Sequence, residues 1–219
     1  MSLAELWSKY GGMYLQALLN TWGMTAISFV FVMILALLIT VMRVSPIRPL
    51  RVVGDLYVQI FRNIPGVSLV IITVYALPHL GITMSYRLCV IVATVLLGSA
   101  FGSENFMSGI NAIGVGQIEA ARSLGLTFTQ IIREIVVPQA LRTSFLPMTN
   151  LLIAVMLTTA LGSQVPLNPT ELTGMVSYVN THDVGGITAF LISAIGYAGT
   201  AFLIGYVGNR LEKKVRIVR

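Results

Sequence analysis

The sequence predicts an all-α membrane protein with about five transmembrane helices, and three observations carry this prediction. First, 56% of the 219 residues are hydrophobic and only 10% are charged, whereas soluble proteins average about 25% charged residues. Second, the apolar residues form runs of about 20 with little or no charge, the length that a helix needs to cross about 30 Å of hydrocarbon. Third, the Lys and Arg residues gather in alternate loops, as cytoplasmic loops do.

The same composition excludes several classes of protein. A soluble domain this poor in charge could not cover its own surface, and the mean hydropathy of +0.85 agrees with a lipid environment. The single Cys89 excludes an internal disulfide and a cysteine-based metal cluster. Soluble enzymes, disulfide-rich secreted domains and disordered chains are therefore set aside.

Five apolar segments are expected to cross the bilayer as helices, because long apolar runs are unlike the alternating segments of membrane β-barrels. In chain order they are Trp22–Met42, Pro65–Gly81, Leu88–Ile110, Ser144–Leu161 and Gly186–Gly208. The second segment is the shortest and carries Pro78 near its far end. Residues 1–21 lack the basic start and the continuous apolar stretch of a secretory signal. We therefore expect an N-terminal amphipathic segment that lies on the membrane surface.

The cations predict the orientation. All Lys and Arg residues except Lys9 and Arg87 lie on one side of the five predicted spans. These cations are Arg43, Arg48, Arg51, Arg62, Arg122, Arg133, Arg142, Arg210, Lys213, Lys214, Arg216 and Arg219. Because loops rich in Lys and Arg stay in the cytoplasm, we expect the N-terminus outside and the C-terminus inside. The net charge of +6 thus reports membrane topology and does not indicate a nucleic-acid partner.

The predicted cytoplasmic segment 111–143 has the start and stop signals of two short helices joined at an elbow. Ile118–Leu124 is typical of a helix that ends at Gly125, because glycine adopts the left-handed conformation common after a helix C-terminus. Thr127–Gln130 has the spacing of a capping box that begins a second helix. Pro138 lacks an amide donor, so we expect a bend there before the fourth span. An ordinary pair of amphipathic surface helices is the alternative interpretation.

The spacing of this segment resembles the EAA loop of ABC-importer permeases. The matching positions are Glu119, Ala120, Ala121, Arg122, Gly125, Ile135 and Pro138, and the family usually has Leu where Val137 precedes the proline. The resemblance implies a type I ABC importer permease fold. It also implies that residues 111–143 form a coupling loop that docks into a cytoplasmic ABC ATPase dimer.

Over roughly residues 20–212 the chain is similar to the polar amino-acid permeases, the histidine, glutamine, glutamate and arginine group, and most of all to glutamate-type members. The stretches that carry the resemblance to the group are Met42–Ser45, Tyr57–Pro65 and Ser103–Ile110, and those that favour glutamate-type members are Met42–Pro46 and Glu119–Leu126. It implies a second permease subunit, an extracytoplasmic solute-binding protein and an amino-acid substrate. ATP and Mg would bind the partner ATPase, since the chain has no glycine-rich phosphate-binding motif. We expect no cofactor, metal or catalytic residue in this chain.

The candidate substrate-pathway residues are Glu104, Met107, Leu157, Thr158 and Thr159. The family usually has Arg at the position of Met107 and Lys at that of Leu157, and a substrate carboxylate would require such a cation. We favour a heterodimer whose partner carries the polar site over a less charged substrate. Glu104 either contacts a substrate ammonium or pairs within the protein. The hydroxyls of Thr158 and Thr159 either line the pathway or, as we favour, bond back to their own helix.

Two local features outside these motifs also yield predictions. Small residues, led by Gly98 and Gly102 in the third span and by Gly196 and Gly199 in the fifth, are typical of close helix contacts in membranes. In the outer loop, Asn168–Glu171 has the pattern of a helix that begins with an asparagine cap followed by proline.

The sequence therefore predicts a single multi-pass permease domain, residues 1–219, in the bacterial cytoplasmic membrane. It would move glutamate or another polar amino acid by alternating access. The alternative is a non-transporting membrane anchor or sensor that kept the ATPase-docking segment and lost the solute path.

Overall fold

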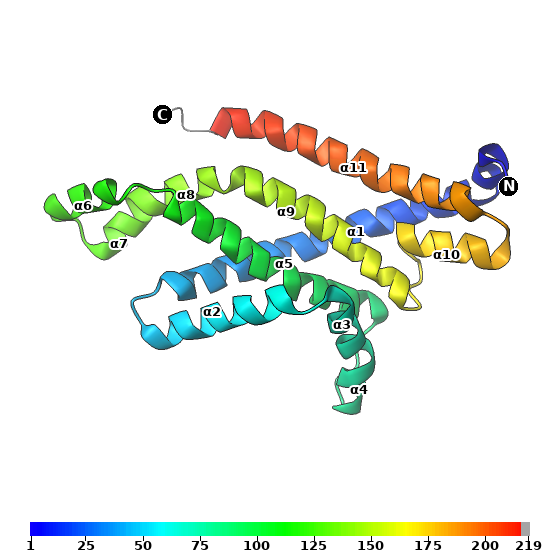
Figure 1. The fold of residues 1–219 in the computed structure, drawn as a ribbon, viewed down its shortest axis with the longest axis horizontal. Helices are drawn as coiled ribbons and strands as arrows, with labels where there is room; N and C mark the ends of the chain where they lie inside the picture. Colours follow the sequence, from blue (N-terminus) through cyan, green and yellow to red (C-terminus); the bar gives the residue numbers. More distant parts are fainter. Residues whose placement is uncertain (216–219) are drawn as a thin grey trace.

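The computed structural model describes residues 1–215 as a set of helices, with no β-strand in that range (Figure 1). The elements are α1 (Leu3–Val44), α2 (Arg48–Asn63), α3 (Gly66–Ile71), a π-helical turn (Ile72–Ala76), α4 (Leu77–His79), α5 (Tyr86–Asn111), α6 (Val115–Ser123), α7 (Phe128–Gln130), a second π-helical turn (Ile131–Val136), α8 (Val137–Thr143), α9 (Phe145–Thr158), a 3₁₀ segment (Thr159–Gln164), α10 (Leu172–His182) and α11 (Gly186–Val215). The all-α prediction is confirmed. Arg216 and Arg219, two of the cations in the predicted cytoplasmic tail, lie outside the described residues.

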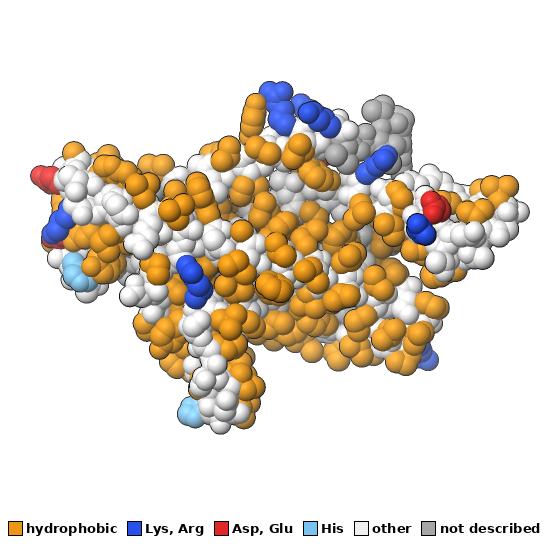
Figure 2. Space-filling model, turned by 180° about the vertical axis from the view of Figure 1, so that it is seen from behind, with side chains coloured by type: hydrophobic (Ala, Val, Ile, Leu, Met, Phe, Trp, Pro, Cys, Tyr) orange, Lys and Arg blue, Asp and Glu red, His pale blue; other side chains and the backbone are white. Residues whose placement is uncertain are grey.

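Four helical stretches are long and apolar enough to cross a membrane, and a fifth span results if one bent pair is counted. The four are α1, α5, α9 with its 3₁₀ extension, and α11. The bent pair joins α2 to residues Gly66–His79 at an angle of 101°. Because Gly66–His79 would extend only about 21 Å at 1.5 Å per residue, the predicted second span is shorter than the hydrocarbon core. Apolar side chains cover most of the face shown in Figure 2.

The first 21 residues are not a separate segment, because α1 continues through them without a break for 42 residues, or about 63 Å. One face of this part of α1 is buried against α10 and α11. The buried residues on that face are Leu6, Tyr10, Tyr14 and Ala17. The Tyr14 hydroxyl donates a hydrogen bond to the Ala189 carbonyl over 3.0 Å. Residues 1–21 were expected to lie on the membrane surface, whereas in the structure one face of this part of α1 packs against the protein itself.

Helices α1 and α5 approach closely along the small residues of α5. A Cβ atom on Gly98 would lie 2.7 Å from Cγ2 of Val32, and one on Gly102 would lie 2.7 Å from Cβ of Ala36. The predicted thin face of the third span is therefore confirmed. In α11 the predicted close contact is found at one glycine and not at the other. A Cβ on Gly196 would lie 3.0 Å from Leu172, whereas no atom of the described chain lies within 4 Å of a Cβ placed on Gly199.

Helix α10 begins later than the sequence pattern predicted. Its N-cap is Glu171, not Asn168. The buried Glu171 carboxylate accepts hydrogen bonds from the amides of Thr173 and Gly174 at 2.6 and 2.7 Å, and from the Tyr197 hydroxyl at 2.8 Å. Burial raises the pKa of Glu171, and these hydrogen bonds oppose the rise. Asn20 of α1 binds the carbonyls of residues 169 and 170, which holds the preceding stretch outside the helix.

The α1–α5 contact predicts a position-specific cost for one added methyl group. In Gly102→Ala the new carbon meets the Ala36 methyl, and neither can rotate away, so we expect the free energy of unfolding to fall by about 1–3 kcal/mol. Gly23→Ala in α1 is the matched control, because no atom lies within 4 Å of its added Cβ and alanine favours the helix. Unfolding in mixed detergent micelles measures both. Equal stability of the two variants would contradict the close contact.

Candidate functional site

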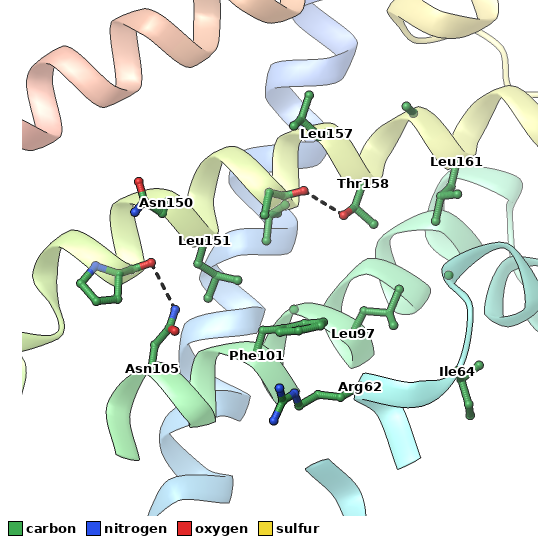
Figure 3. Close-up of a pocket in the computed structure, with 16 residues that line it drawn as sticks. Arg62, Ile64, Leu97, Phe101, Asn105, Asn150, Leu151, Leu157, Thr158 and Leu161 are labelled. Carbon is green, nitrogen blue, oxygen red and sulfur yellow. Dashed lines mark hydrogen bonds between the residues drawn. The ribbon is translucent and has the colours of Figure 1, made fainter. Parts of the chain in front are cut away.

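A cavity of about 910 Å³ lies between α5, α9 and the bend that joins α2 to α3 (Figure 3). Apolar side chains make up most of its wall, including Leu97 and Phe101 of α5 and Leu151 of α9. The polar side chains on the wall are those of Arg62, Asn105, Asn150 and Thr158. A mostly apolar pocket with a few polar groups is the usual form of a small-molecule site, and the volume lies within the range of about 300–1,000 Å³.

The backbone bend at one side of the cavity depends on a glycine. A Cβ on Gly66 would lie 3.0 Å from methyl carbons of both Leu97 and Leu161. The missing side chain therefore lets the start of α3 pass close to α5 and to the segment after α9. The other two walls, α5 and α9, are joined by Asn105 of α5, whose side-chain amide donates a hydrogen bond to the Pro147 carbonyl of α9 at 3.1 Å.

The structure brings only part of the predicted substrate-pathway set to this cavity. Leu157 and Thr158 line it. The Thr158 hydroxyl donates to the Ala154 carbonyl of its own helix at 2.8 Å, which is the alternative that the sequence favoured. Thr159 is fully buried on another side of the helix, where its hydroxyl donates to the Met156 carbonyl at 2.6 Å. Glu104 and Met107 also lie outside the lining.

Glu104 takes part in an ion-pair network that joins α1, α2 and α5. One carboxylate oxygen lies 2.7 Å from Nη1 of Arg43, and the other lies 3.2 Å from Nη1 of Arg62. Nε of Arg43 is also 2.8 Å from Asp55, and its Nη1 donates to the Ser103 hydroxyl at 3.2 Å. Of the two expectations for Glu104, this structure displays the pairing one.

Arg62 is the cavity residue that sequence reasoning missed. It was counted as a loop cation that reports topology, yet its guanidinium lines the cavity and lies 5.5 Å from the centre of the Phe101 ring. Figure 3 shows Arg62 beside Phe101 on the side opposite the α9 residues. The sequence feature that could have identified Arg62 is its position three residues before Pro65, where the second span is predicted to begin. Arg43 is likewise no free loop charge, because only 14% of its side chain is exposed.

The predicted elbow between α5 and α9 has the expected local structure. Helix α6 ends before Gly125, whose φ of +79° is the left-handed conformation. Thr127 and Gln130 form the predicted capping box, with the Thr127 amide donating to the Gln130 side chain at 2.8 Å. The side chains of Gln139 and Gln117 join the two arms by a 2.7 Å hydrogen bond. We call residues 113–140 the knob.

Pro138 does not end the helix in which it lies. Helical turns run on from Phe128 to Thr143, and the interruption before α9 falls at Ser144. Pro138 lies in the first turn of α8, directly after a π-helical turn. A proline is tolerated in a first turn, because its missing amide would lack an α-helical partner there.

The predicted coupling residues divide into an exposed group and an internal group. Exposed are Glu119, Ala120, Arg122, Gly125 and Pro138. Ala121 is buried and Ile135 is half-buried in the small apolar core of the knob. The most exposed large apolar residue of the knob is Leu124, at 81%.

Residues 33–217 match the family described as binding-protein-dependent transport system inner membrane component. The chain belongs to this family. It is therefore a multi-pass inner-membrane permease subunit of an importer, and not a catalytic subunit.

Curated relatives align along almost the whole chain. The glutamate transport system permease protein GluC of Corynebacterium efficiens is 33% identical, over 98% of this chain and 99% of its own length. The L-cystine transport system permease protein TcyB of Bacillus subtilis is 30% identical, over 94% of this chain and 85% of its own. The probable glutamine ABC transporter permease protein GlnP of the same organism is 30% identical, over 96% and 93%.

Solved structures confirm the fold. A crystal structure of an amino acid ABC transporter with histidines superposes with a TM-score of 0.92 at 22% identity, over 98% of this chain and 99% of the other. The MetNI methionine ABC transporter superposes with a TM-score of 0.78 at 23% identity, over 99% and 100%. The predicted ABC importer permease fold is thereby confirmed.

The ion-pair network predicts unequal costs for removing two arginines. Arg43→Met leaves Asp55 without its partner and Glu104 with the longer pair only, so we expect the free energy of unfolding to fall by about 2–3 kcal/mol. Arg48→Met, in the exposed first turn of α2, removes no interaction seen within residues 1–215 and should leave stability unchanged. Unfolding in mixed micelles compares them. Equal small losses would show that the network does not hold these helices.

Proposed function

We propose that this subunit moves a polar amino acid, glutamate or another of that class, through the cavity between α5 and α9 by alternating access. The observation that carries the proposal is a mostly apolar cavity whose one charged lining residue, among those described, is Arg62. A charged side chain at membrane depth is costly and usually serves a function. A substrate carboxylate is its natural complement, and the glutamate, glutamine and cystine permeases among the relatives support that class.

The cavity favours a transporter over a non-transporting anchor or sensor. A non-transporting anchor would need the knob alone. The feature that favours an anchor is the replacement of the family's usual Arg and Lys by Met107 and Leu157 in this chain. Arg62 gives the chain a cation at the cavity from a different element. For the same reason, these two substitutions no longer favour a heterodimer with the second permease subunit over a homodimer.

The proposal assigns ATP and Mg to a separate cytoplasmic ATPase dimer that docks on the knob. It also places the N-terminus outside, where a solute-binding protein delivers the substrate. In support, the knob and the end of α11 lie at one end of the molecule, opposite the N-terminus and α10 (Figure 1). Leu124 and Phe128 expose apolar surface on the knob, and the exposed Glu119 and Arg122 flank it with charge.

Uptake by the reconstituted transporter tests this function. The chain is placed in liposomes with the ATPase, permease and binding protein encoded beside it, and a panel of labelled amino acids is offered. We expect accumulation of one polar amino acid that depends on ATP. An intact complex that hydrolyses ATP and accumulates none of the panel would contradict the proposal.

The elbow gives a separate test of ATPase docking. Gly125→Val places a β-branched residue at a φ of +79°, which disfavours this elbow shape by about 1–2 kcal/mol relative to a relaxed one. Because the free elbow would relax and must regain this shape to dock, docking of the ATPase should weaken by about 5- to 30-fold. Gly116→Ala, also in the knob, meets open space and serves as the control. Binding of the purified ATPase to the permease in nanodiscs measures both. Unchanged docking of Gly125→Val would exclude the elbow geometry from the contact.

A further inference from the structure

We propose that Arg62 is the anion-binding residue of the cavity, and that a substrate carboxylate binds it by displacing Glu104. The inference rests on the proposed function of the cavity. It adds the residue that recognises the substrate and the chemical group that is recognised.

The two arginines that bind Glu104 hold it unequally. The pair with Arg43 is the shorter, at 2.7 Å, and the Arg43 side chain is only 14% exposed. The pair with Arg62 is 3.2 Å long, and 40% of the Arg62 side chain is exposed. Charge pairs are stronger when they are short and shielded from water. Arg62 is therefore the partner that Glu104 can lose.

Arg43 keeps the network paired when Arg62 leaves it. Glu104 would still bind Arg43, and Arg43 would still bind Asp55 at 2.8 Å. Removing one partner of a buried ion pair is costly because the other charge stays unpaired, and this arrangement avoids that cost. In the empty cavity Glu104 neutralises Arg62, and in the loaded cavity the substrate carboxylate takes over. One carboxylate thus replaces another.

The geometry of Arg62 suits this exchange. Its guanidinium lies 5.5 Å from the centre of the Phe101 ring, a cation–π contact that orients the planar group. A guanidinium has five N–H donors and can bind a carboxylate through two of them. Within residues 1–215, Glu104 is the one carboxylate that binds Arg62. Donors therefore remain for a ligand in the cavity that the side chain lines.

The competing explanation is that the Arg62–Glu104 pair only ties α2 to α5. The two explanations predict different effects of removing the Glu104 charge on ligand binding. If the pair is structural, removing either charge breaks this bridge and should weaken ligand binding, Glu104→Gln at least as much as Arg62→Gln because it also breaks the pair with Arg43. If Glu104 competes with the ligand for Arg62, removing Arg62 weakens binding and removing Glu104 does not.

The experiment measures ligand binding to the complete permease–ATPase complex in nanodiscs, without the binding protein. The probes are L-glutamine, L-glutamate and L-glutaminamide, in which a neutral amide replaces the α-carboxylate. We expect Arg62→Gln to weaken L-glutamine binding by about 10- to 100-fold and to leave L-glutaminamide binding unchanged. Glu104→Gln should maintain or strengthen L-glutamine binding. Comparison of L-glutamate with L-glutamine shows whether a side-chain carboxylate also uses Arg62.

Controls separate binding from folding. Arg48→Gln changes an exposed arginine of the same helix and should bind as the wild type does. Arg62→Lys keeps the charge without the two-donor geometry, so it should lose less affinity for L-glutamine than Arg62→Gln, and it remains informative if the glutamine variant does not fold.

Two results would overturn the inference. One is a loss of L-glutamine binding in Glu104→Gln that is as large as that in Arg62→Gln, or larger. The other is an Arg62→Gln complex that still prefers L-glutamine to L-glutaminamide by the wild-type ratio. Either result leaves the transport function standing if the wild-type complex takes up amino acids, whereas a wild-type complex that neither binds nor transports any of them rejects the proposed function first.

Discussion

Arg43 is the group on which the packing of α1, α2 and α5 against one another depends. Lipid offers no solvation to ions, so Glu104 in α5 requires a cation at membrane depth. Arg43, from the end of α1, supplies it and also binds Asp55 of α2, which fixes three helices against one another. Gly54 lets α2 come this near, because a Cβ there would lie 2.7 Å from Cγ of Arg43. With α2 held in place, its last turn directs Arg62 to the cavity.

The knob is joined directly to the helices that form two walls of this cavity. Helix α5 leads into α6, and α8 leads into α9 through Ser144. Close to these junctions, the Ser144 hydroxyl donates to the Asn105 carbonyl at 3.1 Å, and the Asn105 amide donates to Pro147. A force applied to the knob therefore acts on α5 and α9 together. Such a linkage between packed helices is the physical requirement for moving a binding site from a remote contact.

Features governed by local chemistry could be predicted from the sequence. The positions of α5, α9 and α11 follow from the apolar runs, and the elbow follows from Gly125 and the Thr127 cap, because each depends on residues within a few positions. Features that depend on distant partners could not. Asn20 in α1 holds residues 169 and 170 outside α10, and Arg62 pairs with Glu104 of α5. Residues 1–21 were expected on the membrane surface, because the sequence does not show that the distant helices α10 and α11 cover Leu6, Tyr10 and Tyr14.

In the proposed function, Arg62 from the first predicted loop supplies the cavity with the kind of cation that the fourth-span pattern lacks. Charge counting assigned every arginine of that loop to topology, since the positive-inside tendency cannot distinguish a cation at the surface from one that pairs inside. Arg62 lies in the last turn of α2, directly before the bend in which Gly66 packs against Leu97 and Leu161, and it lines the cavity.

A structure of the intact transporter with its amino acid bound would test the central claim most directly. The predicted result is an amino acid in the cavity between α5 and α9, with a carboxylate within hydrogen-bonding distance of the Arg62 guanidinium and with Glu104 held by Arg43 alone. An amino acid bound elsewhere, or one in the cavity while Arg62 still pairs with Glu104, would contradict it.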